Sequence, residues 1–125
     1  MGGRGAWSGV SFRLRNYRRA VIVRSRISDY LLNPLKSKGK SDFLKALGYN
    51  MKNQAHLQAD IKNGLKSNKA RYTEPNKFGR VRFQVNMVIG LNKKARVATG
   101  WFMNKGDAAP QLASLRPYRG KKDDF

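Results

Sequence analysis

Three lysines around a glycine have the plainest capacity for chemistry in this sequence. Lys36, Lys38 and Lys40 flank Gly39, and Ser41 predicts the start of a helix directly after them. Ammonium groups and the free N–H groups of a helix start can together bind a phosphate. The segment lacks the spaced glycines of a P-loop. It is therefore either a phosphate-binding loop or an ordinary solvated basic loop.

A second candidate site is a run of alternating polar residues later in the chain. Arg80 and Arg82 are followed by Gln84 and Asn86 at the same two-residue spacing. On a β-strand this spacing places the side chains on one face, where two guanidinium groups can clamp phosphates in a bidentate manner. The alternative is a polar strand face that simply contacts solvent.

A third candidate lies between Arg96 and Trp101. Thr99 and Trp101 share one face of a predicted strand, and Gly100 between them permits a close approach of another backbone. A threonine hydroxyl can donate to a phosphate oxygen, and an indole ring can stack on a base. The alternative is a core tryptophan beside a β-branched residue that fills the strand.

Two single residues complete the candidates. His56 is the one histidine of the chain and lies on a predicted helix, where an exposed surface position is favoured over a role as general base. Tyr72 lies near the start of a predicted strand and can orient a phosphate. The alternative for Tyr72 is an amphipathic tyrosine at a sheet edge.

The composition narrows the classes of function. The 125 residues include 27 Lys and Arg but only 7 Asp and Glu, which gives a net charge of +20. Such an excess predicts a polyanionic partner, with nucleic acid first, then an anionic membrane surface or an acidic protein. Scattered carboxylates, one histidine and no cysteine argue against two-metal, carboxylate-pair, zinc and thiol chemistry. We expect no metal, no cofactor, no membrane-spanning segment and no signal peptide.

Helices are predicted in the first half of the chain. A short helix follows Ser28 as its N-cap and ends before Pro34. A second runs over residues 41–47, capped by Ser41 and followed by Gly48 at the C′ position. The third covers residues 53–65, because apolar residues recur at every fourth position, namely Leu57, Ile61 and Leu65.

Strands dominate the second half of the chain. The predicted strands cover residues 70–74, 80–89, 94–103 and 111–116, with a further short one at residues 20–23. Residues 90–93 form a hairpin loop between the two long strands. Helices followed by an antiparallel sheet of about four strands predict an α+β fold. We expect a basic Gly/Arg-rich arm over residues 1–25, a domain over 26–118 and a mobile tail over 119–125.

Three stretches together carry a resemblance to a known family. These are Asp29-Tyr30-Leu31-Leu32-Asn33-Pro34, then Lys40, Phe43 and Leu47-Gly48-Tyr49, and finally Arg96, Thr99, Trp101 and Pro110. In their order and spacing they resemble a bacterial polymorphic toxin domain, of the contact-dependent or phage-borne kind. That domain is similar to the barnase/EndoU/colicin/RelE-like (BECR) ribonucleases, and to the colicin D-like ones among them. The resemblance covers about residues 26–118.

The resemblance implies a BECR-like fold and a toxin that cleaves RNA, often tRNA, in the cytoplasm of a target bacterium. It also implies neutralisation by an acidic immunity protein. In this resemblance Thr99 stands at a catalytic serine, Trp101 matches a tryptophan, and Lys38 or Lys40 stands near a basic pair. Colicin D-like domains carry a histidine in the early segment and this chain has none there, so the general base is left open.

The leading hypothesis is a monomeric, metal-independent ribonuclease in which the 2′-OH attacks phosphorus and leaves a 2′,3′-cyclic phosphate. Lys38 and Lys40 would supply charge and proton transfer, Thr99 a phosphate hydrogen bond and Trp101 a stacking surface. The RNA-binding residues would be Lys36, Tyr72, Arg80, Arg82 and Arg96. The alternative is a non-catalytic nucleic-acid-binding protein of the phage or ribosome-associated type. A group-transfer enzyme has no motif to support it.

Overall fold

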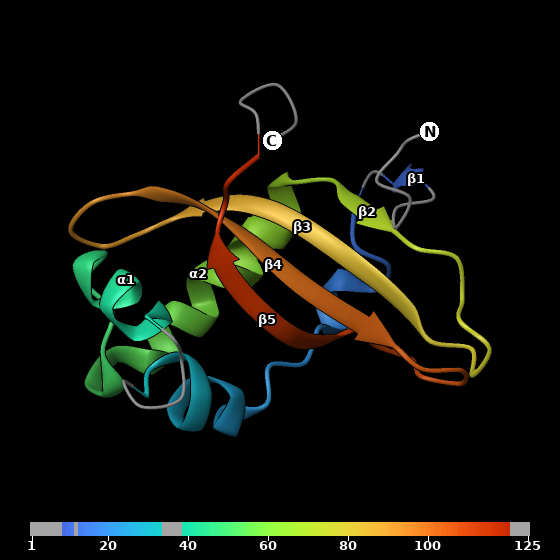
Figure 1. The fold of residues 1–125 in the computed structure, drawn as a ribbon, viewed down its shortest axis with the longest axis horizontal. Coiled ribbons are helices and arrows are strands. Elements are labelled where there is room, and N and C mark those ends of the chain that lie inside the picture. The colour runs from blue at the N-terminus through green and yellow to red at the C-terminus, as the bar shows by residue number, and fades with distance from the viewer. Residues whose placement is uncertain (1–8, 12, 34–38, 121–125) are drawn as a thin grey trace.

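The computed structural model describes residues 9–11, 13–33 and 39–120, and it shows an α+β fold (Figure 1). One antiparallel sheet has the strand order β1-β2-β3-β4-β5. Its strands are β1 (Gly9–Ser11), β2 (Ala70–Tyr72), β3 (Val81–Ile89), β4 (Ala95–Met103) and β5 (Gln111–Pro117). Between β1 and β2 lie η1 (Tyr17–Arg19), η2 (Arg26–Leu31), α1 (Lys40–Ala46), η3 (Met51–Asn53) and α2 (Gln54–Ser67). The predicted helix-then-sheet order is confirmed, with β1 as an additional edge strand.

The alternation predicted for the central strand decides which face of the sheet is buried. Phe83, Val85 and Met87 on β3 point into the core, whereas Arg82 on the other face is exposed. The long β3–β4 pairing runs from Val81 opposite Met103 to Ile89 opposite Ala95. Figure 1 shows α2 lying against one face of this sheet.

Helix α2 is stabilised by the burial of its predicted apolar stripe in the core. Leu57, Ile61 and Leu65 are all fully buried. Gly64 lies at the closest approach to the sheet, since a Cβ built there would come within 2.4 Å of the Met87 Sδ atom. The absence of a side chain at Gly64 therefore sets the spacing between α2 and β3.

Helix α1 confirms its predicted end but not its predicted start. Gly48 has a φ of 103° and occupies the position after the helix that needs a left-handed residue. At the other end, Gly39 occupies the N-cap and Ser41 is buried inside the first turn, so the prediction that Ser41 caps the helix is wrong. Gly39, in a left-handed conformation, takes the N-cap position two residues before the predicted serine.

The N-terminal segment differs most from the sequence-based expectation. Residues 20–23 form only an isolated bridge between Val21 and Gln111 instead of a strand. Ser28 does not begin a helix, because it lies within the π-helical η2, where its hydroxyl donates to the Arg24 carbonyl at 3.2 Å. A π-helical turn has no simple sequence signature.

The predicted boundary at residue 26 is also wrong. Leu14, Ala20 and Ile22 are buried in the same core as the helices and the sheet, and β1 pairs with β2. The described part of the predicted arm therefore belongs to the fold. Most of the predicted tail, residues 121–125, lies outside the described residues. Across the part of the chain that is described, no helix has the length and apolar character needed to cross a membrane.

Candidate nucleic-acid interface

The face of the sheet turned away from α2 presents one arginine from each of β2, β3, β4 and β5. The strand register places them on the same face, each at a different level along the strands: Arg71 lies opposite Gln84, Arg82 opposite Phe102, Arg96 opposite Val88, and Arg116 opposite Ala98. Residues opposite one another in a register share a face. We call this surface the arginine face and define it by Arg71, Arg82, Gln84, Asn86, Arg96, Phe102, Ser114 and Arg116.

Hydrogen bonds order the centre of the arginine face. Arg116 reaches diagonally across from β5, and its Nη2 donates to Gln84 Oε1 at 3.4 Å. The Gln84 amide donates to Asn86 Oδ1 at 2.8 Å. Beside them Ser114 fills the space over Gly100, where a Cβ would meet the serine Oγ at 2.6 Å. The glycine thus admits a neighbouring side chain of the same sheet.

Arg80 joins one corner of this face, as its spacing from Arg82 predicts. Its guanidinium lies over the Phe102 ring, with Cζ 4.3 Å from the ring centroid. Its Nε donates to Asn104 Oδ1 at 2.8 Å. The contacts hold a cation and a partly exposed aromatic ring together, which is the pairing that binds phosphates and bases of single strands.

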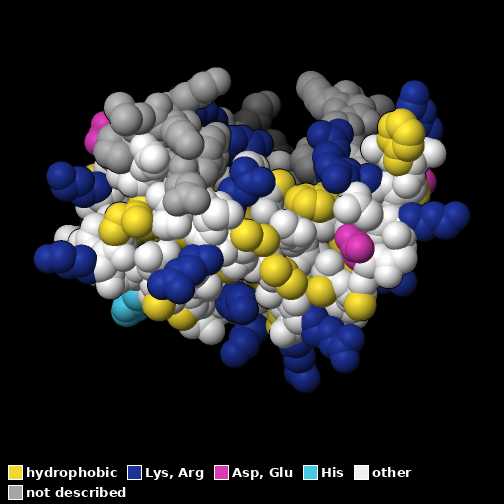
Figure 2. All heavy atoms as spheres, turned by 90° about the horizontal axis from the view of Figure 1, so that it is seen from below, with side chains coloured by type: hydrophobic (Ala, Val, Ile, Leu, Met, Phe, Trp, Pro, Cys, Tyr) yellow, Lys and Arg dark blue, Asp and Glu magenta, His cyan; other side chains and the backbone are white. Residues whose placement is uncertain are grey.

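Acidic residues are absent from the strands themselves, since none of β1–β5 contains Asp or Glu. The described acids lie instead on the helical elements and in two loops: Asp29, Asp42, Asp60, Glu74 and Asp107. Figure 2 shows another view of the surface, on which Lys and Arg side chains are widely spread and few acidic ones are visible. The strands themselves therefore contribute positive and no negative side-chain charge to this face.

Thr99 and Trp101 do share a strand face, but it is the buried one. Thr99 is 0% exposed and Trp101 is 1% exposed. The Trp101 indole N–H donates to Thr99 Oγ1 at 2.8 Å, and the Thr99 hydroxyl donates to the Val85 carbonyl at 2.8 Å. Both side chains are satisfied within the core, so in this structure neither can contact a phosphate or a base. The hypothesis that they are catalytic is contradicted.

The predicted lysine site is only partly described. Lys36 and Lys38 lie outside the described residues. Lys40 is the first residue of α1, and Leu44 of this helix is buried in the core on the helix-covered side of the sheet. Lys40 therefore does not belong to the arginine face. Arg82 and Arg96, by contrast, lie on that face as exposed side chains.

Tyr72 lies on the inner side of β2, beyond the end of α2. It lines an open cavity of about 710 Å³ whose other walls include Arg13, Arg15, Phe83 and Lys105. Asn16 holds the N-terminal segment against this end of the sheet by donating to the Ala108 carbonyl at 2.6 Å. The structure thus separates Tyr72 from the arginines with which it was grouped.

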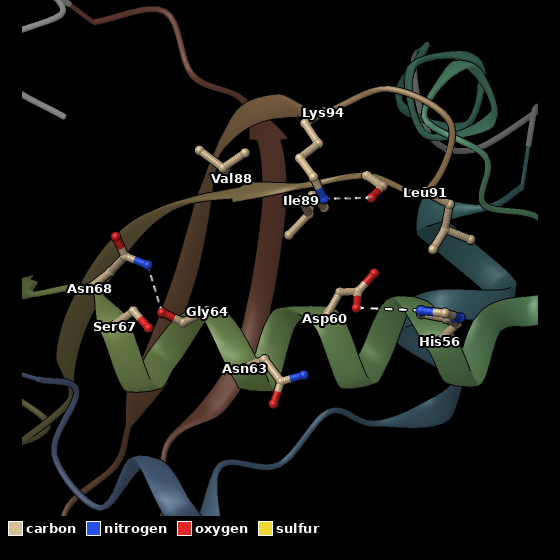
Figure 3. Close-up of a pocket in the computed structure, with 11 residues that line it drawn as sticks. His56, Asp60, Asn63, Gly64, Ser67, Asn68, Val88, Ile89, Leu91 and Lys94 are labelled. Carbon is tan, nitrogen blue, oxygen red and sulfur yellow. Dashed lines mark hydrogen bonds and ion pairs between the residues drawn. The ribbon is translucent and has the colours of Figure 1, made fainter.

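His56 is an exposed surface residue, as predicted from the sequence, and it lines an open pocket beside α2. His56 Nε2 lies 3.6 Å from Asp60 Oδ1, one helical turn away. The Tyr49 hydroxyl donates to Asp60 Oδ2 at 2.5 Å. Burial, and then the neighbouring Asp60 carboxylate, raise the pKa of Tyr49, which keeps this hydroxyl protonated as a donor. The pocket has a volume of about 580 Å³, and Lys94 enters it from the opposite wall (Figure 3).

The four-residue spacing of His56 and Asp60 was visible in the sequence, because such pairs meet on a helix. The hydrogen bond of Tyr49 to Asp60 and the position of Lys94 in the same pocket were not visible, because these residues come from distant parts of the chain. Across the described ranges, no three His, Asp or Glu side chains gather closely enough to hold a metal ion.

An α+β domain with a basic sheet face on one side of its core is the class of protein that these observations define. Residues 13–119 match a family model described as a domain of unknown function (DUF6883), and the chain belongs to that family. No curated protein and no solved structure matches it. The resemblance to toxin ribonucleases therefore stays a prediction.

Proposed function

We propose that this protein binds single-stranded RNA on the arginine face. The observation that carries the proposal is the set of four arginines on four adjacent strands, on a sheet face that no described helix covers. At about 4.8 Å between strands the four arginines spread over about 14 Å across the sheet, and at about 3.4 Å per residue the levels of Arg82 and Arg96 lie about 20 Å apart along the strands. Guanidinium groups at this spacing can follow the backbone of a short single strand.

The aromatic ring on the same face supports a single strand over a duplex. Phe102 is partly exposed between Arg80 and Arg82, and unpaired bases stack on such rings. A rigid duplex keeps its bases stacked on each other and contacts a flat basic face through phosphates alone. We therefore expect single-stranded RNA to bind more tightly than duplex DNA of the same length.

The proposal is tested by fluorescence anisotropy with a labelled single-stranded RNA. Arg82→Ala and Arg116→Ala should each weaken binding about tenfold, because a charge-assisted hydrogen bond contributes about 1.5 kcal/mol. Lys62→Ala is the matched control, because Lys62 is an exposed cation on α2, away from the sheet face. Equal losses in all three variants would mean that the arginine face holds no special site.

A second candidate function is metal-independent cleavage of the bound RNA, which the pocket holding His56, Asp60 and Lys94 favours. It is tested by incubating the protein with tRNA in EDTA and looking for fragments that end in a 2′,3′-cyclic phosphate. In a toxin, a neutralising acidic partner would cover the arginine face. Such a protein would then compete with RNA for binding.

A further inference from the structure

We propose that the pocket between α2 and the β3–β4 hairpin is an RNA cleavage site in which His56 and Lys94 contact the scissile phosphodiester. The inference rests on the proposed RNA binding and adds to it the place where the chemistry occurs. The pocket is lined by His56, Asp60, Asn63, Ser67, Asn68 and Lys94, among others. It therefore combines a proton acceptor, a cation and neutral hydrogen-bonding groups around one open space.

His56, whose side chain is 54% exposed, has an anchored carboxylate beside it. Asp60 is 23% exposed, and both of its oxygens have partners: Tyr49 donates to Oδ2, and His56 Nε2 lies 3.6 Å from Oδ1. Tyr49 itself is 1% exposed and belongs to the core. A carboxylate anchored in this way beside the ring can stabilise the imidazolium that forms when His56 accepts a proton. An ordinary surface ion pair on a helix has no such buried anchor.

The cation faces the histidine from another element. Lys94 precedes β4, and its Nζ lies 3.4 Å from the Gly90 carbonyl of the same hairpin loop. Figure 3 shows this side chain extending toward the helix that carries Asp60 and His56. The loop is itself fixed, since the N–H groups of Leu91 and Asn92 donate to the Leu47 carbonyl at 2.7 and 3.0 Å. The loop is therefore fixed to the C-terminal end of α1.

The pocket and the arginine face meet at one edge of the sheet. Strand β2 pairs with β3 only as far as Val85, so among the described strands nothing covers the rest of β3 on that side. Val88 lies on this stretch, is 49% exposed, lines the pocket and stands opposite Arg96 in the register. An RNA strand on the arginine face can pass Arg96, cross this edge and place a phosphate in the pocket.

The reaction needs only the RNA and a proton acceptor. The His56 imidazole removes the proton of the 2′-OH, the 2′ oxygen bonds to phosphorus, and the bond from phosphorus to the 5′ oxygen breaks. The departing 5′ oxygen takes a proton from solvent, and the imidazolium returns its proton to solvent. The Lys94 ammonium stabilises the charge that develops on the phosphoryl oxygens. The products are a 2′,3′-cyclic phosphate and a 5′-hydroxyl, with no water consumed.

The inference is tested by single-turnover cleavage of a labelled single-stranded RNA in EDTA, with protein in excess over its dissociation constant. His56→Ala and Lys94→Ala should each slow cleavage about 100-fold or more while RNA affinity changes little. Lys93→Ala is the matched control, because Lys93 is the neighbouring exposed lysine but does not line the pocket. Asp60→Asn, a positioning variant, should lower the rate without weakening binding, and its melting temperature shows whether the fold is kept.

The outcomes separate the two proposals. Slow cleavage by the pocket variants with normal binding supports the site. Cleavage by His56→Ala and Lys94→Ala at the wild-type rate overturns the site but leaves RNA binding intact. Binding without any cleavage by the wild-type protein also overturns the site. Failure of the wild-type protein to bind RNA overturns the proposed function itself.

Discussion

At the scale of single residues, the buried pair Thr99 and Trp101 shows how the same side chains can suggest chemistry and serve structure. Their alternation in the sequence is typical of one strand face, but it does not say which face. The structure places them in the core, where the Trp101 N–H has Thr99 Oγ1 as its acceptor. The pair therefore stabilises the core, and we expect its loss to change stability more than RNA binding.

Thr99→Val should lower the free energy of unfolding by about 1–3 kcal/mol, because it leaves the buried indole N–H without its acceptor. Urea unfolding followed by tryptophan fluorescence measures the change. Thr99→Ser keeps the hydroxyl and should cost less, which makes it the matched control. A Thr99→Val protein that is folded yet no longer binds RNA would contradict a purely structural role and show that Thr99 belongs to the RNA interface.

Tyr49 gives a prediction on pH dependence. Its folded pKa is raised above the usual value of about 10, chiefly by burial and then by Asp60. The folded state therefore holds the phenolic proton more tightly than the unfolded state does. The associated stability is present below about pH 10 and is lost as the pH rises from there toward the raised folded value.

Melting temperatures should accordingly fall more steeply above about pH 10 in the wild-type protein than in Tyr49→Phe, which has no phenol to ionise. Below that pH, Tyr49→Phe should be the less stable of the two by about 1 kcal/mol, because Asp60 loses a hydrogen bond. Parallel melting curves for the two proteins over the whole range would show that the Tyr49 proton is not linked to folding.

At the scale of elements, patterns with a clear period predicted the structure well. The stripe of α2, the alternation of β3 and the hairpin between the two long strands are all as expected, since each is set by which face is buried. The π-helical η2 and the bridge at Val21 were not predicted, because tertiary contacts determine them. The Gly/Arg-rich composition of the N-terminal segment predicted a basic arm, so the burial of Leu14 and Ile22 in the core was not predicted either.

The contact of α2 with β3 depends on the missing side chain at Gly64. Gly64→Ala gains about 1 kcal/mol of helix propensity. It also places a methyl group within 2.4 Å of Met87 Sδ, and overpacking of this kind costs about 1–3 kcal/mol. We expect a net loss of stability in chemical denaturation. Ala59→Gly is the matched control, because Ala59 is exposed on α2 and its replacement changes helix propensity alone. A Gly64→Ala protein that is more stable than the wild-type protein would contradict the close packing of α2 on β3.

At the scale of the whole molecule, the charge predicted the kind of partner but not the place where it binds. The sequence predicted RNA binding by Arg80, Arg82 and Arg96, and the register places these residues on or beside one face. The same face also carries Arg71 and Arg116, which lie on strands whose neighbours in the sheet cannot be read from the sequence. Tyr72 and Lys40 lie elsewhere. Pairing between strands that are far apart in sequence is what turns scattered cations into a surface.

The salt dependence of RNA binding tests the arginine face most directly. Each phosphate contact on a single strand contributes about 0.7 to the slope of log affinity against log salt. The double variant Arg82→Ala/Arg116→Ala should therefore bind with a slope smaller than that of the wild-type protein by about 1.4. An unchanged slope in this variant would place the RNA on another surface and contradict the account.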